Sequence, residues 1–219
     1  MALPTFILRA VHWLQKLTTG RGSSQQPQTG VRLDPVTVLD GGEVALEVLQ
    51  AIGYRTTLKT ATIVSYNMQD YDFWGHGVLS HLLLRQLSLG ASIQLMTTPP
   101  PGKATSQGFK NKYQLLSQLQ KNGVAVYLNA KLHAKAYLFL DSSETKTAIV
   151  GSANLTGPGF GMTLAPHDNL VEMALLTGDS TIFQGALEFV DQKIVNDTRT
   201  EDFATWFSRN SIEIGKAGI

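Results

Sequence analysis

The chain has 219 residues, which is enough for one main domain of about 150 to 200 residues with an appendage. It contains no cysteine, and this excludes disulfides, zinc sites built on thiolates and cysteine nucleophiles. The formal net charge is only +1, but the stretch between Asp72 and Asp141 holds seven Lys or Arg residues and no acid. Such a segment suits a polyanionic partner, either nucleic acid or an anionic membrane surface, unless its cations are scattered over the folded surface.

The first 31 residues differ in character from the rest of the chain. Residues 3–17 space their apolar side chains as a helix does and place their cations on another face, which predicts a short basic amphipathic helix. Such a helix can dock on its own domain or on a second subunit, make weak contact with a membrane surface, or act as an organelle-targeting presequence. The stretch TGRGSSQQPQTG that follows has linker composition. We therefore expect a helix with a flexible linker over 1–31 and one domain over 32–219.

Targeting signals are the next feature to consider. Residues 1–17 lack the charged start and the small-residue cleavage site of a signal peptide. No run of about 20 apolar residues occurs that would span a membrane. These features predict a cytoplasmic protein.

Along the predicted domain, apolar residues alternate between helical and extended spacing. Helical spacing predicts helices over 41–54, 78–90, 113–123 and 180–197. Runs of β-branched and apolar residues predict strands over 60–66, 91–97, 124–128, 133–141, 147–152 and 169–178. The stretch 98–112, rich in Pro and Lys, is predicted to be a loop. Together these elements predict an α/β fold whose mixed, mostly parallel sheet has helices on both faces.

One predicted strand carries polar residues in an apolar setting. In KLHAKAYLFLD, His133 and Lys135 are two positions apart, so an extended chain places both side chains on one face. A buried lysine without a partner is costly, so Lys135 must reach solvent or meet an anion. The second strand of the hairpin ends in GSANLTG, where Ser152 and Asn154 add polar donors. Imidazole, ammonium, hydroxyl and amide together predict a phosphate site with its own nucleophile.

These residues resemble the signature of the phospholipase D superfamily, which is H-x-K followed after a spacer by G-S-x-N. The signature stands once in this chain, as HAK at 133–135 and GSAN at 151–154. The order of predicted elements over 40–195 is also similar to that family. The resemblance implies a phospholipase D-like fold with catalytic residues His133, Lys135, Ser152 and Asn154.

An acidic residue of the family pattern stands elsewhere in this chain. The usual signature has an aspartate a few residues beyond the lysine, but Leu140 occupies that position and Asp141 follows it. Asp141 is interpreted as a turn residue that opens the DSSETK loop. The resemblance points instead to a glutamate in the strand after the G-S-x-N loop, and DNLVEMALL supplies Glu172. We expect Glu172 to accept a hydrogen bond from Nδ1 of His133 and so to select its tautomer.

The resemblance also implies a mechanism. One histidine attacks phosphorus to give a phosphohistidine, a second histidine protonates the leaving oxygen, and water then reverses the roles. Because this chain has a single H-x-K, the second histidine is expected from another copy across a two-fold axis, in a homodimer. Lys135 and Asn154 would stabilise the phosphoryl oxygens, with Ser152 supporting them, and no metal or other cofactor is expected.

The motif alone leaves the substrate open between nucleic acid and phospholipid. Three lysines in the predicted loop, Lys103, Lys110 and Lys112, would line a groove for a phosphate backbone, and Tyr66 offers a stacking surface. Members of the family that remodel phospholipid usually carry two motifs in one chain, whereas dimeric members with one motif are mostly nucleases. The resemblance therefore favours a nuclease, with DNA ahead of RNA. The alternatives are a phospholipid phosphodiesterase or transferase at a membrane surface, and a nucleic-acid-binding module without turnover.

Other patterns give weaker indications. ETK at 144–146 mimics the acid-x-lysine element of metal-dependent nucleases, but it falls in a predicted polar turn. His76, His81 and His167 lack the spacing of metal ligands, and are interpreted as loop or surface residues. The glycine-rich stretch at 157–161 is interpreted as a flexible lip beside the site rather than a nucleotide loop.

Overall fold

The computed structural model describes residues 36–54, 58–68, 78–156, 159 and 172–216. The chain divides into Met1–Leu33 and Asp34–Ile219, and all described residues belong to the second part. The predicted N-terminal helix and its linker therefore lie outside the described residues, as do His76 and His167.

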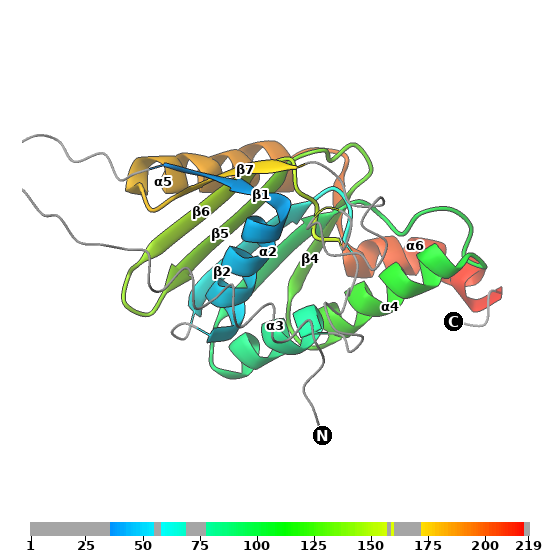
Figure 1. Cartoon of the computed structure of the whole chain (residues 1–219). Helices are drawn as coiled ribbons and strands as arrows, with labels where there is room; N and C mark the ends of the chain where they lie inside the picture. The colour runs from blue at the N-terminus through cyan, green and yellow to red at the C-terminus, as the bar shows by residue number, and fades with distance from the viewer. Residues whose placement is uncertain (1–35, 55–57, 69–77, 157–158, 160–171, 217–219) are drawn as a thin grey trace, which may run out of the picture. The chain divides into compact units, whose positions relative to one another are not determined.

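An eight-stranded sheet forms the centre of the described part (Figure 1). Its strands are β1 (Thr37–Asp40), β2 (Leu58–Ser65), β3 (Ser92–Thr97), β4 (Ala125–Asn129), β5 (Lys135–Asp141), β6 (Lys146–Gly151), β7 (Met173–Thr177) and β8 (Thr200–Asp202). They lie in the order β1-β7-β6-β5-β2-β3-β4-β8. The α/β class and the mixed sheet are thereby confirmed.

The sheet was predicted to be mostly parallel, but most of its neighbouring strands pair antiparallel. Only β2–β3 and β3–β4 pair in parallel, while the other neighbours are antiparallel. The parallel pairs are the ones joined through a helix. β5 and β6 are joined by a link of only 142–145, which is too short for a crossover and returns the chain as an antiparallel hairpin.

Helices cover both faces of the sheet (Figure 1). They are α2 (Gly41–Leu49) with the π-helical turn Gln50–Tyr54, α3 (Val78–Ser88), α4 (Gln107–Lys121), α5 (Ser180–Phe189) with the π-helical turn Val190–Val195, and α6 (Phe203–Lys216). Alternate residues of β5 point to opposite faces. Tyr137 and Phe139 enter the core beneath α2, α3, α4 and α6, and Ala136 and Leu138 enter the core beneath α5.

Helix α4 begins earlier than the sequence predicted. Ser106 caps it, because the Ser106 hydroxyl oxygen accepts a hydrogen bond from the Phe109 N–H at 3.3 Å. Phe109 is buried and its ring lies 6.2 Å from that of Trp206 on α6. Lys110 and Lys112 therefore lie on a helix and not in a loop, because packing against a distant helix outweighs the local polar composition.

The sequence did not predict β1, β8 or α6. β8 has only three residues, and pairs with β4 as Leu128↔Glu201. α6 packs against α4 through Phe203 and Trp206. α6 completes the core that contains Tyr137 and Phe139, and β1 and β8 are the two outer strands of the sheet.

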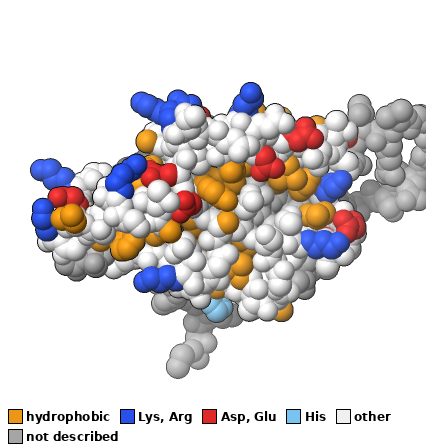
Figure 2. All heavy atoms as spheres, turned by 180° about the vertical axis from the view of Figure 1, so that it is seen from behind, with side chains coloured by type: hydrophobic (Ala, Val, Ile, Leu, Met, Phe, Trp, Pro, Cys, Tyr) orange, Lys and Arg blue, Asp and Glu red, His pale blue; other side chains and the backbone are white. Residues whose placement is uncertain are grey.

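Apolar side chains remain exposed at the β1 end of the sheet. Val38 and Val150 both pair with Leu175, so the three form one row across β1, β7 and β6. All three are 40% exposed or more. Figure 2 shows exposed apolar side chains among charged ones on the rear of the molecule. Among the described elements, α5 covers this face only as far as β5 and β6.

Candidate active site

The chain ends of five strands meet at one edge of the sheet. β2 and β3 run parallel and finish there, and Ser65 at the end of β2 pairs with Lys135 at the start of β5. β6 is antiparallel to β5 and ends there at Gly151, while β7 begins there at Met173. The pairing thus brings the H-x-K segment, the G-S-x-N segment and the start of β7 to a common edge, which is the edge where open α/β sheets bind ligands.

The ring of Tyr66 lies close to both residues of the H-x-K pair. Its ring centroid is 5.3 Å from the His133 ring and 5.6 Å from Nζ of Lys135. His133 is exposed and precedes β5, whereas the prediction placed it within the strand. Tyr66 itself is 42% exposed. The aromatic ring therefore forms one wall of the site, and its polar neighbours on that wall are imidazole and ammonium.

Lys135 is a buried cation, with 8% of its surface exposed. Of the ion pairs among the described residues, none involves Lys135. The face of Tyr66 offsets its charge only in part, since a cation–π contact contributes about 0.5 to 2 kcal/mol. A buried ammonium at a strand end, without a carboxylate partner among the described residues, is suited to an anionic ligand.

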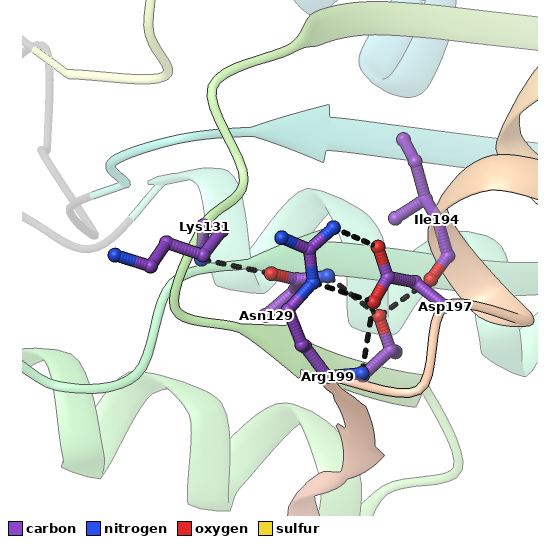
Figure 3. A network of polar contacts seen from close by, with 6 residues as sticks. Asn129, Lys131, Ile194, Asp197 and Arg199 are labelled. Carbon is purple, nitrogen blue, oxygen red and sulfur yellow. Dashed lines mark hydrogen bonds and ion pairs between the residues drawn. The ribbon is translucent and has the colours of Figure 1, made fainter.

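The loop that leads from β4 toward the H-x-K pair is fastened by a network of polar contacts (Figure 3). Asn129 ends β4; its Oδ1 accepts from the Lys131 N–H at 2.8 Å, and its Nδ2 donates to the Thr200 hydroxyl at 2.9 Å. Arg199 belongs to the same network, where its hydrogen bonds lower the pKa of Asp197 to about 2. The start of this loop is therefore anchored to the turn before β8.

The backbone of the G-S-x-N segment is held tightly against β7. A Cβ on Gly151 would lie 2.3 Å from the Met173 carbonyl oxygen and 2.5 Å from Cα of Ala174, so no other residue fits without a shift. Ser152 is bound on both sides: its N–H donates to the Met173 carbonyl at 2.9 Å, and the Met173 N–H donates to its hydroxyl at 3.1 Å. Ser152 therefore fixes the segment to β7.

Asn154 is oriented by the residues that follow β2. The Asn67 N–H donates to Oδ1 of Asn154 at 3.2 Å, which turns the Nδ2 donor away from Asn67. The Leu155 N–H donates to the hydroxyl of the fully buried Ser65 at 2.9 Å, and that hydroxyl donates to the Asn67 carbonyl at 2.5 Å. The two motifs are thus joined by Ser65 and Asn67, neither of which belongs to them.

The glycine-rich stretch after Asn154 contributes one described residue. A Cβ on Gly159 would lie 2.5 Å from the Asn154 carbonyl oxygen and 2.9 Å from the Asn154 nitrogen. The Gly159 N–H donates to the Thr156 hydroxyl at 3.1 Å. Gly159 therefore packs directly on the backbone of Asn154; the other residues of the predicted lip lie outside the described residues.

Tyr137 and Glu172 belong to the same edge. The buried Tyr137 hydroxyl donates to the Ala153 carbonyl at 2.7 Å, inside the G-S-x-N segment. Burial raises the pKa of Tyr137, a hydrogen bond with Ser65 opposes the shift, and the charge of Glu172 adds to it. Glu172 is half-buried, and its described contacts include no hydrogen bond to His133. Its role in selecting the His133 tautomer stays a prediction.

Asp141 lies outside the site. It ends β5, six positions along the strand from Lys135, which is about 20 Å at 3.3 Å per position. Its Oδ1 accepts hydrogen bonds from the N–H groups of Ser143 and Thr145, both at 2.9 Å. Its interpretation as a turn residue is confirmed, and Glu144 in the same turn pairs with Lys59. No group of three or more His, Asp or Glu side chains within the described ranges could hold a metal ion.

The three predicted backbone-binding lysines have separate surroundings. Lys112 is 4% exposed and its ammonium donates to the Thr98 hydroxyl at 2.9 Å. Lys103 is exposed and lines a cavity of about 440 Å³ with residues of α6, among them Asn210 and Glu213. Lys110 is half-buried on α4. The three lysines do not form one described groove with His133. Of the three, Lys112 is the one that a hydrogen bond, to Thr98, connects to the surroundings of the site.

Sequence reasoning missed four residues that hold the site together: Ser65, Asn67, Thr98 and Tyr137. A signal was present for the first three, because each follows or ends an apolar run at the carboxyl end of a parallel strand. Tyr137 carried no such signal, since an apolar strand accommodates tyrosine anywhere.

Residues 54–193 match a family model described as cardiolipin synthase, PLD-like domain. The chain belongs to this PLD-like family. The match spans more than half of the chain and includes both halves of the signature together with Glu172. The resemblance to the phospholipase D superfamily is thereby confirmed, and with it a domain of a class that handles phosphodiesters.

Two solved structures share the PLD-like fold. Phosphatidylserine synthase from Haemophilus influenzae Rd KW20 is 13% identical with a TM-score of 0.54, over 97% of this chain and 55% of that one. Polyphosphate kinase from Porphyromonas gingivalis is 12% identical with a TM-score of 0.51, over 72% of this chain and 26% of that one. The PLD-like chain thus spans about half and about a quarter of these proteins, and the likeness concerns the fold alone. No curated protein matches the sequence.

The helices of the described part fall short of a membrane span. None of them combines the length and apolar character needed to cross a bilayer.

Proposed function

We propose that this PLD-like protein is a metal-independent nuclease that cleaves phosphodiester bonds of DNA, or of RNA, through a phosphohistidine. The observation that carries the proposal is the buried Lys135 ammonium, which shares the Tyr66 ring with His133 and has no carboxylate partner among the described residues. The edge supplies a nucleophile, a cation and an amide donor, and a phosphoryl group requires all three.

In the proposed first step, Nε2 of His133 attacks phosphorus and the bond from phosphorus to the leaving oxygen breaks. Lys135 and Nδ2 of Asn154 stabilise the charge on the phosphoryl oxygens, and this takes the place of a metal ion. The leaving oxygen needs a proton from a second acid. In the second step, water attacks the phosphohistidine, gives its proton to that second group, and releases His133.

The proposed second group is His133 of another copy of the chain, across a two-fold axis. His133 is the single histidine of the H-x-K type, and His81, on α3, is exposed and has no described contact with the site. A homodimer with one shared active site therefore supplies nucleophile and acid from identical chains. Glu172 is proposed to orient each imidazole when substrate is bound, since catalytic hydrogen bonds are often long before binding.

Nucleic acid is the proposed substrate because the sequence stretch that carries the motif lysine is rich in cations. The stretch between Asp72 and Asp141 contributes Lys103 and Lys110 as well as the motif lysine, with no acid among its residues. Tyr66 is exposed beside His133, and an aromatic face next to a phosphate site can stack on a base.

The second candidate is a phospholipid phosphodiesterase or transferase. It is favoured by the family description as a cardiolipin synthase domain and by the fold shared with a phosphatidylserine synthase. In such an enzyme the second substrate would be an alcohol in place of water. Residues 3–17 would then be the proposed membrane contact. A module that binds nucleic acid without turnover is the third candidate.

One experiment separates these candidates. The wild-type protein and His133→Ala are incubated in excess chelator with labelled DNA, with labelled RNA and with liposomes containing cardiolipin or phosphatidylglycerol. We expect chelator-resistant cleavage of a nucleic acid by wild type, loss of nearly all turnover in the variant, and an acid-labile phosphoryl adduct on wild-type protein quenched during turnover. Turnover of lipid alone would favour the second candidate, and binding without any turnover the third.

A further inference from the structure

The backbone of Tyr66 is held by Thr97, the last residue of β3, and by Thr98, which follows it. Three donors converge on the Tyr66 carbonyl oxygen: the Thr98 hydroxyl at 2.8 Å, the Thr98 N–H at 3.4 Å and the Thr97 hydroxyl at 3.4 Å. The shortest of the three bonds is that of the Thr98 hydroxyl. On its other side, the segment after β2 contacts the G-S-x-N segment through Asn67.

The Thr98 hydroxyl is itself held by Lys112. Nζ of Lys112 donates to Oγ1 of Thr98 at 2.9 Å, and Lys112 is only 4% exposed. No ion pair of the described residues includes Lys112, so its ammonium lies in the protein without a described carboxylate. Burial alone lowers the pKa of Lys112 to about 7. Burial of a lysine without an anionic partner costs free energy, so packing alone does not explain a lysine at this position.

The ammonium of Lys112 determines which group donates in its hydrogen bond with Thr98. In its charged form the Lys112 side chain has three protons on Nζ and no lone pair, so it can only donate. When Lys112 donates to Thr98, the hydroxyl must accept, and its one proton then goes to the Tyr66 carbonyl. Lys112 thus sets the direction of the Thr98 hydroxyl bond, and a residue that cannot donate would leave that hydroxyl able to rotate.

We infer that Lys112 is a positioning residue of the H-x-K site, which acts through Thr98 to hold Tyr66 against His133 and Lys135. The kinetic part of this inference rests on the proposed function; the structural part does not. It replaces direct contact of Lys112 with the substrate backbone, because a side chain that is 4% exposed and bound to Thr98 presents little of itself to a ligand.

The test uses four variants of the full chain. Lys112→Met keeps the length of the side chain and removes the donor, and Thr98→Val keeps the shape of threonine and removes the hydroxyl. Thr98→Ser retains the hydroxyl and serves as the conservative rescue. Lys121→Met is the matched control, because Lys121 is exposed at the other end of α4.

The first readout is independent of turnover. Ring signals of Tyr66 and His133 are recorded by ¹H–¹³C NMR, since the chemical shift of each ring depends on the position of the other. We expect these signals to move in Lys112→Met and Thr98→Val, and to stay at their wild-type positions in Thr98→Ser and Lys121→Met. Wild-type ring signals in both donor-removing variants would overturn the inference.

The second readout is the division of the kinetic effect. Misplacement of catalytic groups by about an ångström lowers kcat by up to about 100-fold. We expect Lys112→Met and Thr98→Val to lose about 10- to 100-fold in kcat with KM nearly unchanged, and Thr98→Ser to retain activity. A raised KM at constant kcat in Lys112→Met, without the same effect in Thr98→Val, would instead assign Lys112 to substrate binding and overturn the inference.

Failure of the proposed function has a different signature. If the wild type turns over none of the substrates while the ring signals move as expected, the positioning role stands and the nuclease proposal fails. If turnover is normal in the two donor-removing variants, the nuclease proposal stands and the positioning role fails.

Discussion

The Asn67 N–H donates to Oδ1 of Asn154 at 3.2 Å, although 87 positions separate the two residues in the chain. Asn67 follows β2 and Asn154 follows β6, and these strands lie on either side of β5. The bond therefore spans the strand that carries Lys135 and sets which end of the Asn154 amide points away from Asn67.

This bond separates two roles of Asn154. In Asn154→Asp the carboxylate can still accept from Asn67, but an anion replaces the Nδ2 donor beside a phosphoryl group. We expect Asn154→Asp to keep a melting temperature close to that of wild type and to lose about 100- to 1,000-fold in kcat, as when one oxyanion donor is removed. Melting curves and single-turnover rates check this. Retention of wild-type kcat would remove Asn154 from the proposed transition state.

The close contact of Gly151 with β7 predicts a large effect on stability. A Cβ there would lie 2.3 Å from the Met173 carbonyl oxygen, so Gly151→Ala must push β6 and β7 apart. We expect it to lower the free energy of unfolding by about 1 to 3 kcal/mol, measured in urea. Gly185→Ala on α5 is the control: nothing lies within 4 Å of its Cβ, and it should be neutral or stabilising by up to about 1 kcal/mol. Equal effects of the two substitutions would contradict the prediction.

Lys112 predicts a pH dependence of stability. Its pKa is about 7 in the folded protein and about 10.5 when unfolded, so the unfolded state binds more protons between these values. The stability of the wild type should therefore rise with pH in that window, by up to about 1.4 kcal/mol per unit from this residue. Lys112→Met lacks this rise, so the free energy of unfolding of wild type should increase relative to that of Lys112→Met from pH 7 to pH 9.

Urea unfolding of both proteins at pH 7, 8 and 9 measures this difference directly. Lys121→Met serves again as the control, because Lys121 is exposed. A constant difference between wild type and Lys112→Met across the three pH values would show that Lys112 keeps an ordinary pKa.

The proposed sharing of one site by two chains predicts how activity depends on the composition of a mixture. When His133→Ala is mixed with wild type and the chains exchange at random, heterodimers carry one motif histidine. If these are inert, activity falls with the square of the wild-type fraction. The measurement is the initial rate against composition, with the oligomeric state followed by light scattering. A linear fall would mean that each chain supplies its own acid and would rule out the shared site.

Lys103, which is exposed before α4, and Lys110 on α4 predict how nucleic-acid affinity depends on salt concentration. Lys103→Ala combined with Lys110→Ala should weaken nucleic-acid binding and reduce the slope of log affinity against log salt, by roughly 0.7 to 0.9 for each phosphate that the variant no longer neutralises. Lys121→Ala, at the far end of α4, should leave the slope unchanged. An unchanged slope in the double variant would move the nucleic-acid path away from this segment.

Local patterns in the sequence were sufficient for the central part of the site. His133 and Lys135 are two residues apart and so lie near each other even though His133 precedes β5, and the hairpin through 142–145 brings Gly151 and Asn154 back toward the start of β5. The apolar periodicity likewise predicted α2, α3, α5 and the central strands, because burial of one face follows from residue spacing alone. Asp141 could be assigned to a turn for the same reason, since its bonds are to its own neighbours.

The tertiary structure decided what depends on contacts between distant segments. Helix α4 begins at Gln107, after the Ser106 cap, because Phe109 packs on Trp206 of α6, nearly a hundred residues further on, and this start places Lys112 on the helix. The sequence around Lys112 is polar and typical of a loop, but in the folded chain this lysine is buried and its ammonium donates to the Thr98 hydroxyl. Propensity and periodicity depend only on the residues that are near in the sequence. Burial and hydrogen bonding depend on the residues that are near in space, and these can be distant in the sequence.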